Sequence, residues 1–136
     1  MARDRRKFSL KKLADKQILV VEDHPFLAET LTELLTVFDN PAHADSGKEA
    51  LKQIKQKRPD IILLDLSLPD INGLELARRL RQNETTESIP ILAMSGSPTD
   101  RRDCLQAGCD DFILKPFTTS TLLARLSKLA VRGVRI

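Results

Sequence analysis

The 136-residue sequence predicts an α/β fold in which helices cover both faces of a central five-stranded parallel sheet. Short apolar runs alternate about five times with stretches whose apolar residues recur at helical spacing, as in βαβ units. The best-defined runs are continuously apolar, which is typical of strands buried on both faces of a parallel sheet. The expected architecture is therefore a doubly wound three-layer sandwich.

The first βα unit is predicted from residues 17–21, an apolar run that ends in two acids. Pro25 suits the first position of the following helix, where its missing N–H would have no partner in any case. His24 is expected only to open this helix, and Asn40-Pro41 to end it. The apolar stripe of the helix consists of Leu27, Leu31, Leu34, Leu35 and Phe38.

The sequence patterns that predict the next two strands differ in strength. Residues 42–44 form a weak candidate, followed by Ser46 and Glu49, whose spacing is that of a capping box at the start of a second helix. Residues 61–64, Ile-Ile-Leu-Leu, form a strong candidate. This third strand runs directly into Asp65, which places a carboxylate at its carboxyl end.

The second half of the chain continues the alternation. Asn72 is the expected N-cap of a third helix, and residues 90–94 form the fourth strand. A short helix is predicted to begin at Ser97-Pro98 and to end at Gly108, since glycine can adopt the left-handed conformation after the last turn. The last strand is predicted over residues 111–114. The final helix has its apolar positions at Leu122, Leu123, Leu126, Leu129 and Ala130.

Composition excludes several classes of protein. No apolar run approaches the ~20 residues that span a bilayer, and the charged residues 1–16 do not resemble a signal peptide, so a soluble cytoplasmic protein is expected. Cys104 and Cys109 lack the spacing of zinc ligands and are expected to be reduced, structural thiols. The absence of Trp and Tyr removes the usual stacking groups for a flavin or a single-stranded nucleic acid.

Charge is distributed unevenly along the chain. The net charge of +3 combines +5 in residues 1–16, +4 in residues 123–136 and −6 in the body between them. A basic arm can attract nucleic acid or an acidic partner, or it can be a solvated tail. Because residues 1–16 lack a sustained apolar stripe, we expect a disordered arm there, one domain over residues 17–131 and a short tail over residues 132–136.

The candidate site residues follow four of the five predicted strands. Right-handed crossovers direct the carboxyl ends of all parallel strands to one edge of the sheet, where ligands of open α/β sheets bind. The side chains expected to meet at this edge are Glu22, Asp23, Asp65, Ser95 and Lys115.

Three carboxylates held together repel one another and require a counter-charge, which Lys115 supplies only in part. Ligands that are all oxygen atoms favour a hard cation, and Mg²⁺ commonly binds through one or two carboxylates together with a phosphate. The site therefore suits phosphoryl transfer, with Asp65 as the nucleophile. Ser95 and Lys115 would hold the phosphoryl oxygens.

These residues also share a resemblance to a known family, carried by five separately spaced features. They are the Glu22-Asp23 pair, the Asp65-Leu66-Ser67-Leu68-Pro69 sequence, Gly73, Ser95 and Lys115-Pro116. Together they resemble the receiver domain of two-component response regulators over roughly residues 17–130.

The resemblance implies a flavodoxin-like strand order of 2-1-3-4-5 and a cis peptide before Pro116. It implies that Asp65 accepts a phosphoryl group from a histidine kinase or phosphotransfer protein, and that the domain catalyses its own phosphorylation and dephosphorylation rather than acting as a turnover enzyme. It also implies a Mg²⁺ site formed by Glu22, Asp23, Asp65 and the backbone carbonyl of Ser67.

The resemblance further implies a switch. Ser95 and the ring of Phe112 would move together on phosphorylation and reshape the face made by the helix before residues 111–114, that strand and the final helix. This face would bind a downstream protein partner, and a homodimer is a further possibility. No membrane contact is expected, and no dedicated DNA-binding domain, because the chain ends soon after the final helix.

Three alternatives remain. A pseudo-receiver would have the same fold and bind partners without taking up phosphate. A phosphatase of the haloacid dehalogenase type also forms an aspartyl phosphate, but it requires a second aspartate two residues on, where this chain has Ser67. A flavodoxin-like carrier would need a phosphate-binding loop after the first strand, where Glu22 and Asp23 would repel phosphate.

Overall fold

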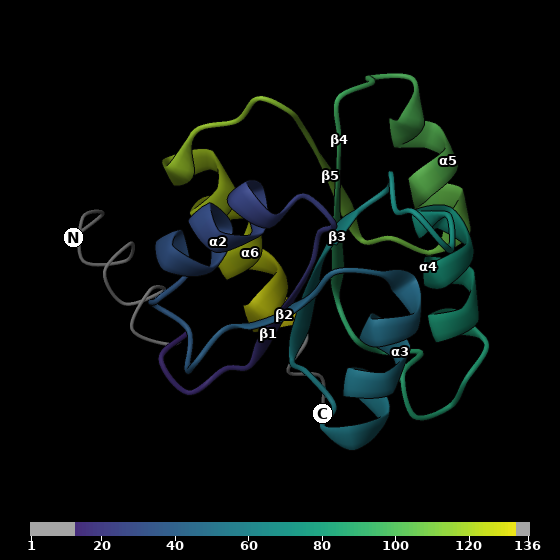
Figure 1. Cartoon of the computed structure of the whole chain (residues 1–136), viewed down its shortest axis with the longest axis horizontal. Helices are drawn as coiled ribbons and strands as arrows, with labels where there is room; N and C mark the ends of the chain where they lie inside the picture. The colour runs from purple at the N-terminus through teal and green to yellow at the C-terminus, as the bar shows by residue number, and fades with distance from the viewer. Residues whose placement is uncertain (1–12, 133–136) are drawn as a thin grey trace.

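The structure, a computed structural model, describes residues 13–132 and contains a five-stranded parallel sheet (Figure 1). The strand order β2-β1-β3-β4-β5 confirms the predicted topology. Every pair of neighbouring strands is parallel, so all five strands present their carboxyl ends at the same edge. The strands are β1 (Ile18–Val21), β2 (Ala42–Ala44), β3 (Ile61–Asp65), β4 (Ile91–Ser95) and β5 (Asp111–Leu114).

Helices cover both faces of the sheet, as predicted for a doubly wound sandwich. In Figure 1, α2 and α6 lie on one face, while α3, α4 and α5 lie on the other. These helices are α2 (Pro25–Leu34), α3 (Gly47–Gln56), α4 (Gly73–Arg81), α5 (Asp100–Ala107) and α6 (Thr119–Arg132). Within the described residues, no helix is long and apolar enough to cross a membrane.

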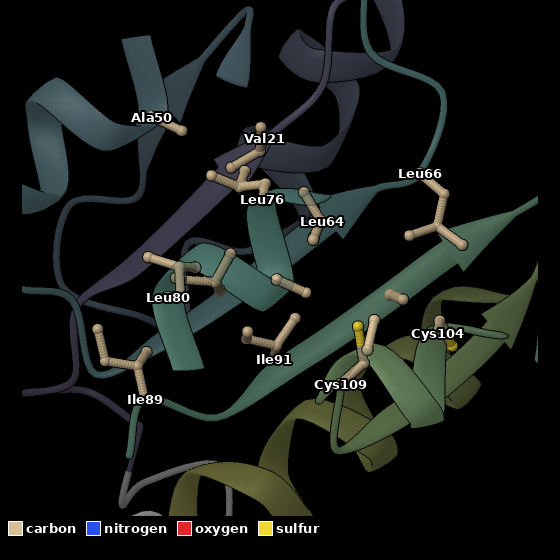
Figure 2. Close-up of a cluster of buried hydrophobic side chains, with 14 of the residues drawn as sticks. Val21, Ala50, Leu64, Leu66, Leu76, Leu80, Ile89, Ile91, Cys104 and Cys109 are labelled. Atoms are coloured by element: carbon tan, nitrogen blue, oxygen red, sulfur yellow. The ribbon is translucent and has the colours of Figure 1, made fainter. Parts of the chain in front are cut away.

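The central strands are buried on both faces, which explains their continuous apolar sequence. All five residues of β3 are buried. Ile62 and Leu64 belong to the hydrophobic cluster on the side of α3, α4 and α5, whereas Ile61 and Leu63 belong to the cluster on the side of α2 and α6. Figure 2 shows part of the first cluster, with Leu64 packed among side chains of neighbouring strands and helices.

Cys104 and Cys109 are free and lie in this same cluster (Figure 2). Burial raises the pKa of the Cys109 thiol to about 12, and burial also raises the pKa of the Cys104 thiol. Both thiols are therefore protonated at neutral pH and lack the thiolate character of reactive cysteines. The prediction of structural thiols agrees with this arrangement.

The predicted helix caps are present. Ser46 Oγ accepts a hydrogen bond of 3.1 Å from the Glu49 amide, and Asn72 Oδ1 accepts one of 2.8 Å from the Leu74 amide. His24 caps α2, because its Nδ1 atom accepts from the Leu27 amide at 3.4 Å. Gly108 ends α5 with a φ of 112°, the left-handed conformation that glycine adopts without strain.

Two helices are shorter than predicted. The helix α2 ends at Leu34 rather than at Asn40-Pro41, and Phe38 reaches the core from the turn that follows. The helix α5 begins at Asp100 rather than at Ser97-Pro98. The amide of Ser97 donates to the Ser95 side chain, which holds this part of the loop outside the helix.

Leu13 extends the folded part of the chain beyond the expected boundary at Gln17. Its side chain is fully buried in the cluster on the side of α2 and α6. Its carbonyl accepts a hydrogen bond from the Lys16 amide, and the Lys16 carbonyl accepts one from the Asp39 amide. The fold therefore begins no later than Leu13, while the predictions for residues 1–12 and 133–136 lie outside the described residues.

Candidate functional site

Asp65 ends β3 in a buried position at the carboxyl edge of the sheet, with only 3% of its surface exposed. The Ser67 amide donates a hydrogen bond of 3.0 Å to Asp65 Oδ1 and so fixes the carboxylate. The chain then passes close to Gly73, where a Cβ atom would lie 2.6 Å from Leu66 Cα and 2.8 Å from the Asp65 carbonyl oxygen. Only glycine fits at position 73 without displacing the backbone that carries Asp65.

Glu22 and Asp23 follow β1 and lie beside Asp65. Each of the three carboxyl groups offers an oxygen atom, and these atoms all lie within 4.8 Å of one another. Glu22 is buried and accepts a hydrogen bond of 3.2 Å from the His24 amide, whereas Asp23 is exposed. The pairing of β1 with β3 places Val21 opposite Leu64, which brings the next residue of each segment, Glu22 and Asp65, close together.

Lys115 contacts two of these acids. Its Nζ atom is 3.2 Å from Asp65 Oδ2 and 3.4 Å from Glu22 Oε1. The Lys115 amide donates to the Ser95 carbonyl at 2.8 Å, and the Lys115-Pro116 peptide is cis, as the resemblance implied. The lysine therefore neutralises part of the negative charge in the pocket.

The surroundings of Glu22 raise the pKa of its carboxyl group. Burial, the largest cause, raises the pKa of Glu22 to about 7, and a hydrogen bond with the Asp65 carboxyl adds to the rise. The His24 amide and the Lys115 ammonium act in the opposite direction. Near neutral pH Glu22 is therefore only partly ionised, and a cation bound beside it would favour the ionised form.

Ser95, at the end of β4, is 4% exposed. Its Oγ atom donates to Asp100 Oδ2 at 2.5 Å and accepts from the Ser97 amide at 3.0 Å. Asp100 was not among the predicted site residues, because its spacing from Ser95 matches no regular pattern.

Phe112 lies in β5 with 5% of its surface exposed, so its ring is part of the core. It therefore presents no sizeable apolar surface to solvent. Leu114, two residues further along β5, and Leu105 of α5 are 42% and 40% exposed. Sequence reasoning did not single out either leucine, since exposure depends on what neighbouring elements cover.

Asp70 anchors the loop that follows Asp65. Its two carboxylate oxygens accept hydrogen bonds of 2.9 Å each from the Gly47 and Lys48 amides at the start of α3. These backbone hydrogen bonds lower the pKa of Asp70, the Lys48 amide having the larger effect. Sequence reasoning missed this role, which depends on the approach of two segments 23 residues apart.

The donor set of the pocket fits a hard divalent cation. Its possible ligands are carboxylate oxygens from Glu22, Asp23 and Asp65, and no sulfur or imidazole belongs to this group among the described residues. Oxygen-only sites suit Mg²⁺ or Ca²⁺ rather than zinc or copper. Together with the Lys115 ammonium, such an arrangement can bind a phosphoryl group, whereas the Ser95 hydroxyl makes its hydrogen bonds with Asp100 and the Ser97 amide.

The chain belongs to the response regulator receiver domain family, whose model matches residues 18–127. Among curated proteins, the DNA-binding response regulator MtrA of Mycolicibacterium smegmatis is 40% identical over 116 residues, which cover 82% of this chain and 49% of MtrA. The chain spans about half the length of the curated relatives it matches.

Solved structures share both the fold and the size of the domain. A putative response regulator from Chloroflexus aurantiacus is 33% identical, with a TM-score of 0.82 and coverage of 87% of this chain and 99% of that one. The receiver domain of the sensor histidine kinase PA1611 from Pseudomonas aeruginosa is 30% identical, with a TM-score of 0.79 and the same coverage. Its structure has a magnesium ion coordinated in the active site cleft.

These relatives correct one expectation. The sequence was expected to act through a downstream protein partner without a dedicated DNA-binding domain, yet MtrA is a DNA-binding response regulator. Since the present chain spans only about half of MtrA, a receiver domain of this kind is compatible with an output that binds DNA. The expectation that a DNA-binding domain is lacking is therefore wrong as an inference from this receiver sequence.

Proposed function

We propose that this domain acts in a phosphorelay, in which Asp65 accepts a phosphoryl group from the phosphohistidine of a histidine kinase. The observation that carries the proposal is the setting of Asp65. Its carboxylate is buried at a strand end, one oxygen is held by the Ser67 amide, and the other lies 3.2 Å from Lys115 Nζ. Glu22 shares the lysine contact and the two neighbouring acids, but it follows β1, whereas Asp65 is itself the last residue of β3.

In the proposed step, a carboxylate oxygen of Asp65 attacks phosphorus and forms an O–P bond. The N–P bond of the phosphohistidine breaks, and its electron pair remains on the imidazole nitrogen. Lys115 lies close enough to Asp65 to stabilise negative charge on the transferred group, the main task of a protein in phosphoryl transfer. Hydrolysis by water then releases inorganic phosphate and restores the carboxylate, so the domain behaves as a self-resetting switch.

Glu22, Asp23 and Asp65, together with the Ser67 carbonyl, would hold Mg²⁺ in this pocket. When bound, Mg²⁺ supplies positive charge to the phosphoryl oxygens and to the acids. The proposal is supported by the oxygen-only cluster and by the magnesium ion in the related PA1611 receiver domain.

Phosphorylation would change the face formed by α5, β5 and α6. Ser95 lies at the end of β4, where its hydroxyl could turn toward a phosphoryl group, and Phe112 lies on the adjacent strand. Movement of both side chains would alter the surface that carries Leu105 and Leu114, which are partly exposed apolar side chains suited to a protein contact.

Phosphorylation by acetyl phosphate, read as intact mass, tests the proposal. Wild-type protein should gain one phosphoryl group in Mg²⁺ and none in EDTA, and Asp65→Asn should gain none in either. Asp60→Asn is a matched control, since Asp60 lies before the same strand and binds the Gln17 amide away from the acidic cluster. Absence of uptake in the wild type would instead support a pseudo-receiver.

A further inference from the structure

The Ser95 hydroxyl has two hydrogen-bond partners in the structure. A hydroxyl has a single proton to donate, and Ser95 donates it to Asp100 Oδ2. The same oxygen accepts from the Ser97 amide, so two partners from the following loop and helix fix the position of this buried side chain. A phosphoryl oxygen can accept the Ser95 proton only after Asp100 has lost it.

We propose that Asp100 is a positioning residue that holds the Ser95 hydroxyl in the unphosphorylated state and competes with the phosphoryl group for its proton. The proposal rests on the proposed function and adds to it a specific competitor. Among the described residues, no hydrogen bond joins Asp100 to the Asp65 carboxylate, and Asp100 acts through Ser95. Its carboxylate is a charged acceptor, and hydrogen bonds to charged groups are stronger than those between neutral groups.

Loss of the Ser95 hydrogen bond would also affect α5, because Asp100 is the first residue of this helix. The helix N-terminus is weakly capped: within the described part of the chain, the Thr99 side chain makes no capping hydrogen bond. A carboxylate released there can interact with the free amide groups and the helix dipole. The exchange of partners by Ser95 thus links the phosphoryl site to the N-terminus of α5.

Three substitutions separate the hydrogen bond from the charge. Asp100→Ala removes both the acceptor and the negative charge, while Asp100→Asn removes the charge but keeps an oxygen that can accept from Ser95. Asp103→Ala is the matched control, since Asp103 carries the same charge in the first turn of the same helix and is exposed. A Ser95→Ala background completes a double-mutant cycle.

The test is the affinity of the full chain for beryllium fluoride in the presence of Mg²⁺, measured by NMR titration. This probe mimics a phosphoryl group on a carboxylate. Asp100→Ala should bind it roughly tenfold more tightly than the wild type, because the competing charged hydrogen bond is gone. The affinity of Asp100→Asn should lie between those of the wild type and Asp100→Ala. The affinity of Asp103→Ala should stay within about twofold of that of the wild type. In the Ser95→Ala background, Asp100→Ala should change the affinity no more than Asp103→Ala does.

A second readout needs no phosphoryl mimic. The Ser97 amide donates to Ser95 Oγ, so its NMR shift reports on the position of the hydroxyl. In Asp100→Ala without beryllium fluoride, this shift should move toward its position in the beryllium fluoride complex of the wild type.

Equal affinities of wild type and Asp100→Ala, or an effect of Asp100→Ala that persists without the Ser95 hydroxyl, would overturn the role of Asp100 alone. A wild type that does not bind beryllium fluoride at all would overturn the proposed function together with this inference.

Discussion

Lys115 Nζ lies 3.2 Å from Asp65 Oδ2, although the two residues are 50 positions apart in the chain. The contact forms because β3 and β5 both end at the same edge of the sheet. The lysine side chain is 28% exposed, whereas the Asp65 side chain is 5% exposed, so the positive partner retains some access to water. The Lys115 ammonium thus contacts the two buried acids of the site, Glu22 and Asp65.

Replacement of Lys115 should therefore destabilise the metal-free domain. In Lys115→Met the buried Glu22 and Asp65 lose their cationic partner, and we expect the free energy of unfolding to fall by about 1–3 kcal/mol, below the full value for a buried pair because the lysine is partly solvated. Urea melts in EDTA measure this change, with the exposed Lys52→Met as control. Equal stability of Lys115→Met and the wild type would contradict the ion pair.

The raised pKa of Glu22 predicts a pH dependence of stability. The folded state binds the Glu22 proton more tightly than the unfolded chain does, with a pKa of about 7 against 4.5. The associated stabilisation is fully present below pH 4.5 and is lost as the pH rises through about 7, at most about 3 kcal/mol before relaxation. In EDTA, the wild type should lose stability over this range relative to Glu22→Gln, which cannot titrate.

Urea melts of both proteins between pH 4.5 and 8 test this pH dependence. The exposed Glu29→Gln serves as a control for the general effect of losing an acid. A stability difference between wild type and Glu22→Gln that stays constant with pH would contradict the raised pKa. Mg²⁺ should suppress the pH-dependent loss, because a bound cation favours the ionised carboxylate.

The sequence predicted those parts of the site that the topology fixes. Strand ends are recognisable because each apolar run stops abruptly at a polar residue, and parallel strands carry those residues to one edge. Glu22, Asp65 and Lys115 were found in this way, and the structure brings them into contact. The strand order itself came from the family resemblance, since alternating strands and helices are compatible with several orders.

What the sequence could not predict depends on tertiary contacts in loops. Asp100 meets Ser95 only because the loop between them folds back, and nothing in the residue spacing indicates that turn. Asp70 likewise binds the amides at the start of α3, far away in the chain. The burial of Leu13 was not predicted for a different reason, since a single apolar residue in a highly charged segment gives no periodic pattern.

Leu13 should contribute measurably to stability. Its side chain is fully buried among residues of β1, α2 and α6, so Leu13→Ala should lower the free energy of unfolding by about 2–4 kcal/mol. Deletion of residues 1–16 should lower it similarly. Leu34→Ala is a matched control, since Leu34 is 38% exposed and its truncation should cost less than about 1 kcal/mol. Similar effects of the two substitutions in urea melts would contradict the packing of Leu13.

Addition of Mg²⁺ should reduce or reverse the effect of the Asp23 charge on the free energy of unfolding. Asp23 offers a carboxylate oxygen within 4.8 Å of those of Glu22 and Asp65, and without a cation these charges repel. Asp23→Asn should therefore raise the stability in EDTA, by about 0.5–1 kcal/mol because Asp23 is exposed and its charge is screened.

In millimolar Mg²⁺ the stabilities of the wild type and Asp23→Asn should become similar, or the wild type should become the more stable protein. A ligand that binds only the folded state stabilises it by mass action, and the substituted protein binds that ligand more weakly. Urea midpoints of both proteins, each measured in EDTA and in Mg²⁺, give the four values required. Asp39→Asn controls for the loss of an exposed acid elsewhere, and it should respond to Mg²⁺ as the wild type does. If Asp23→Asn is less stable than the wild type in EDTA, or if Mg²⁺ stabilises both proteins equally, Asp23 does not belong to a cation site.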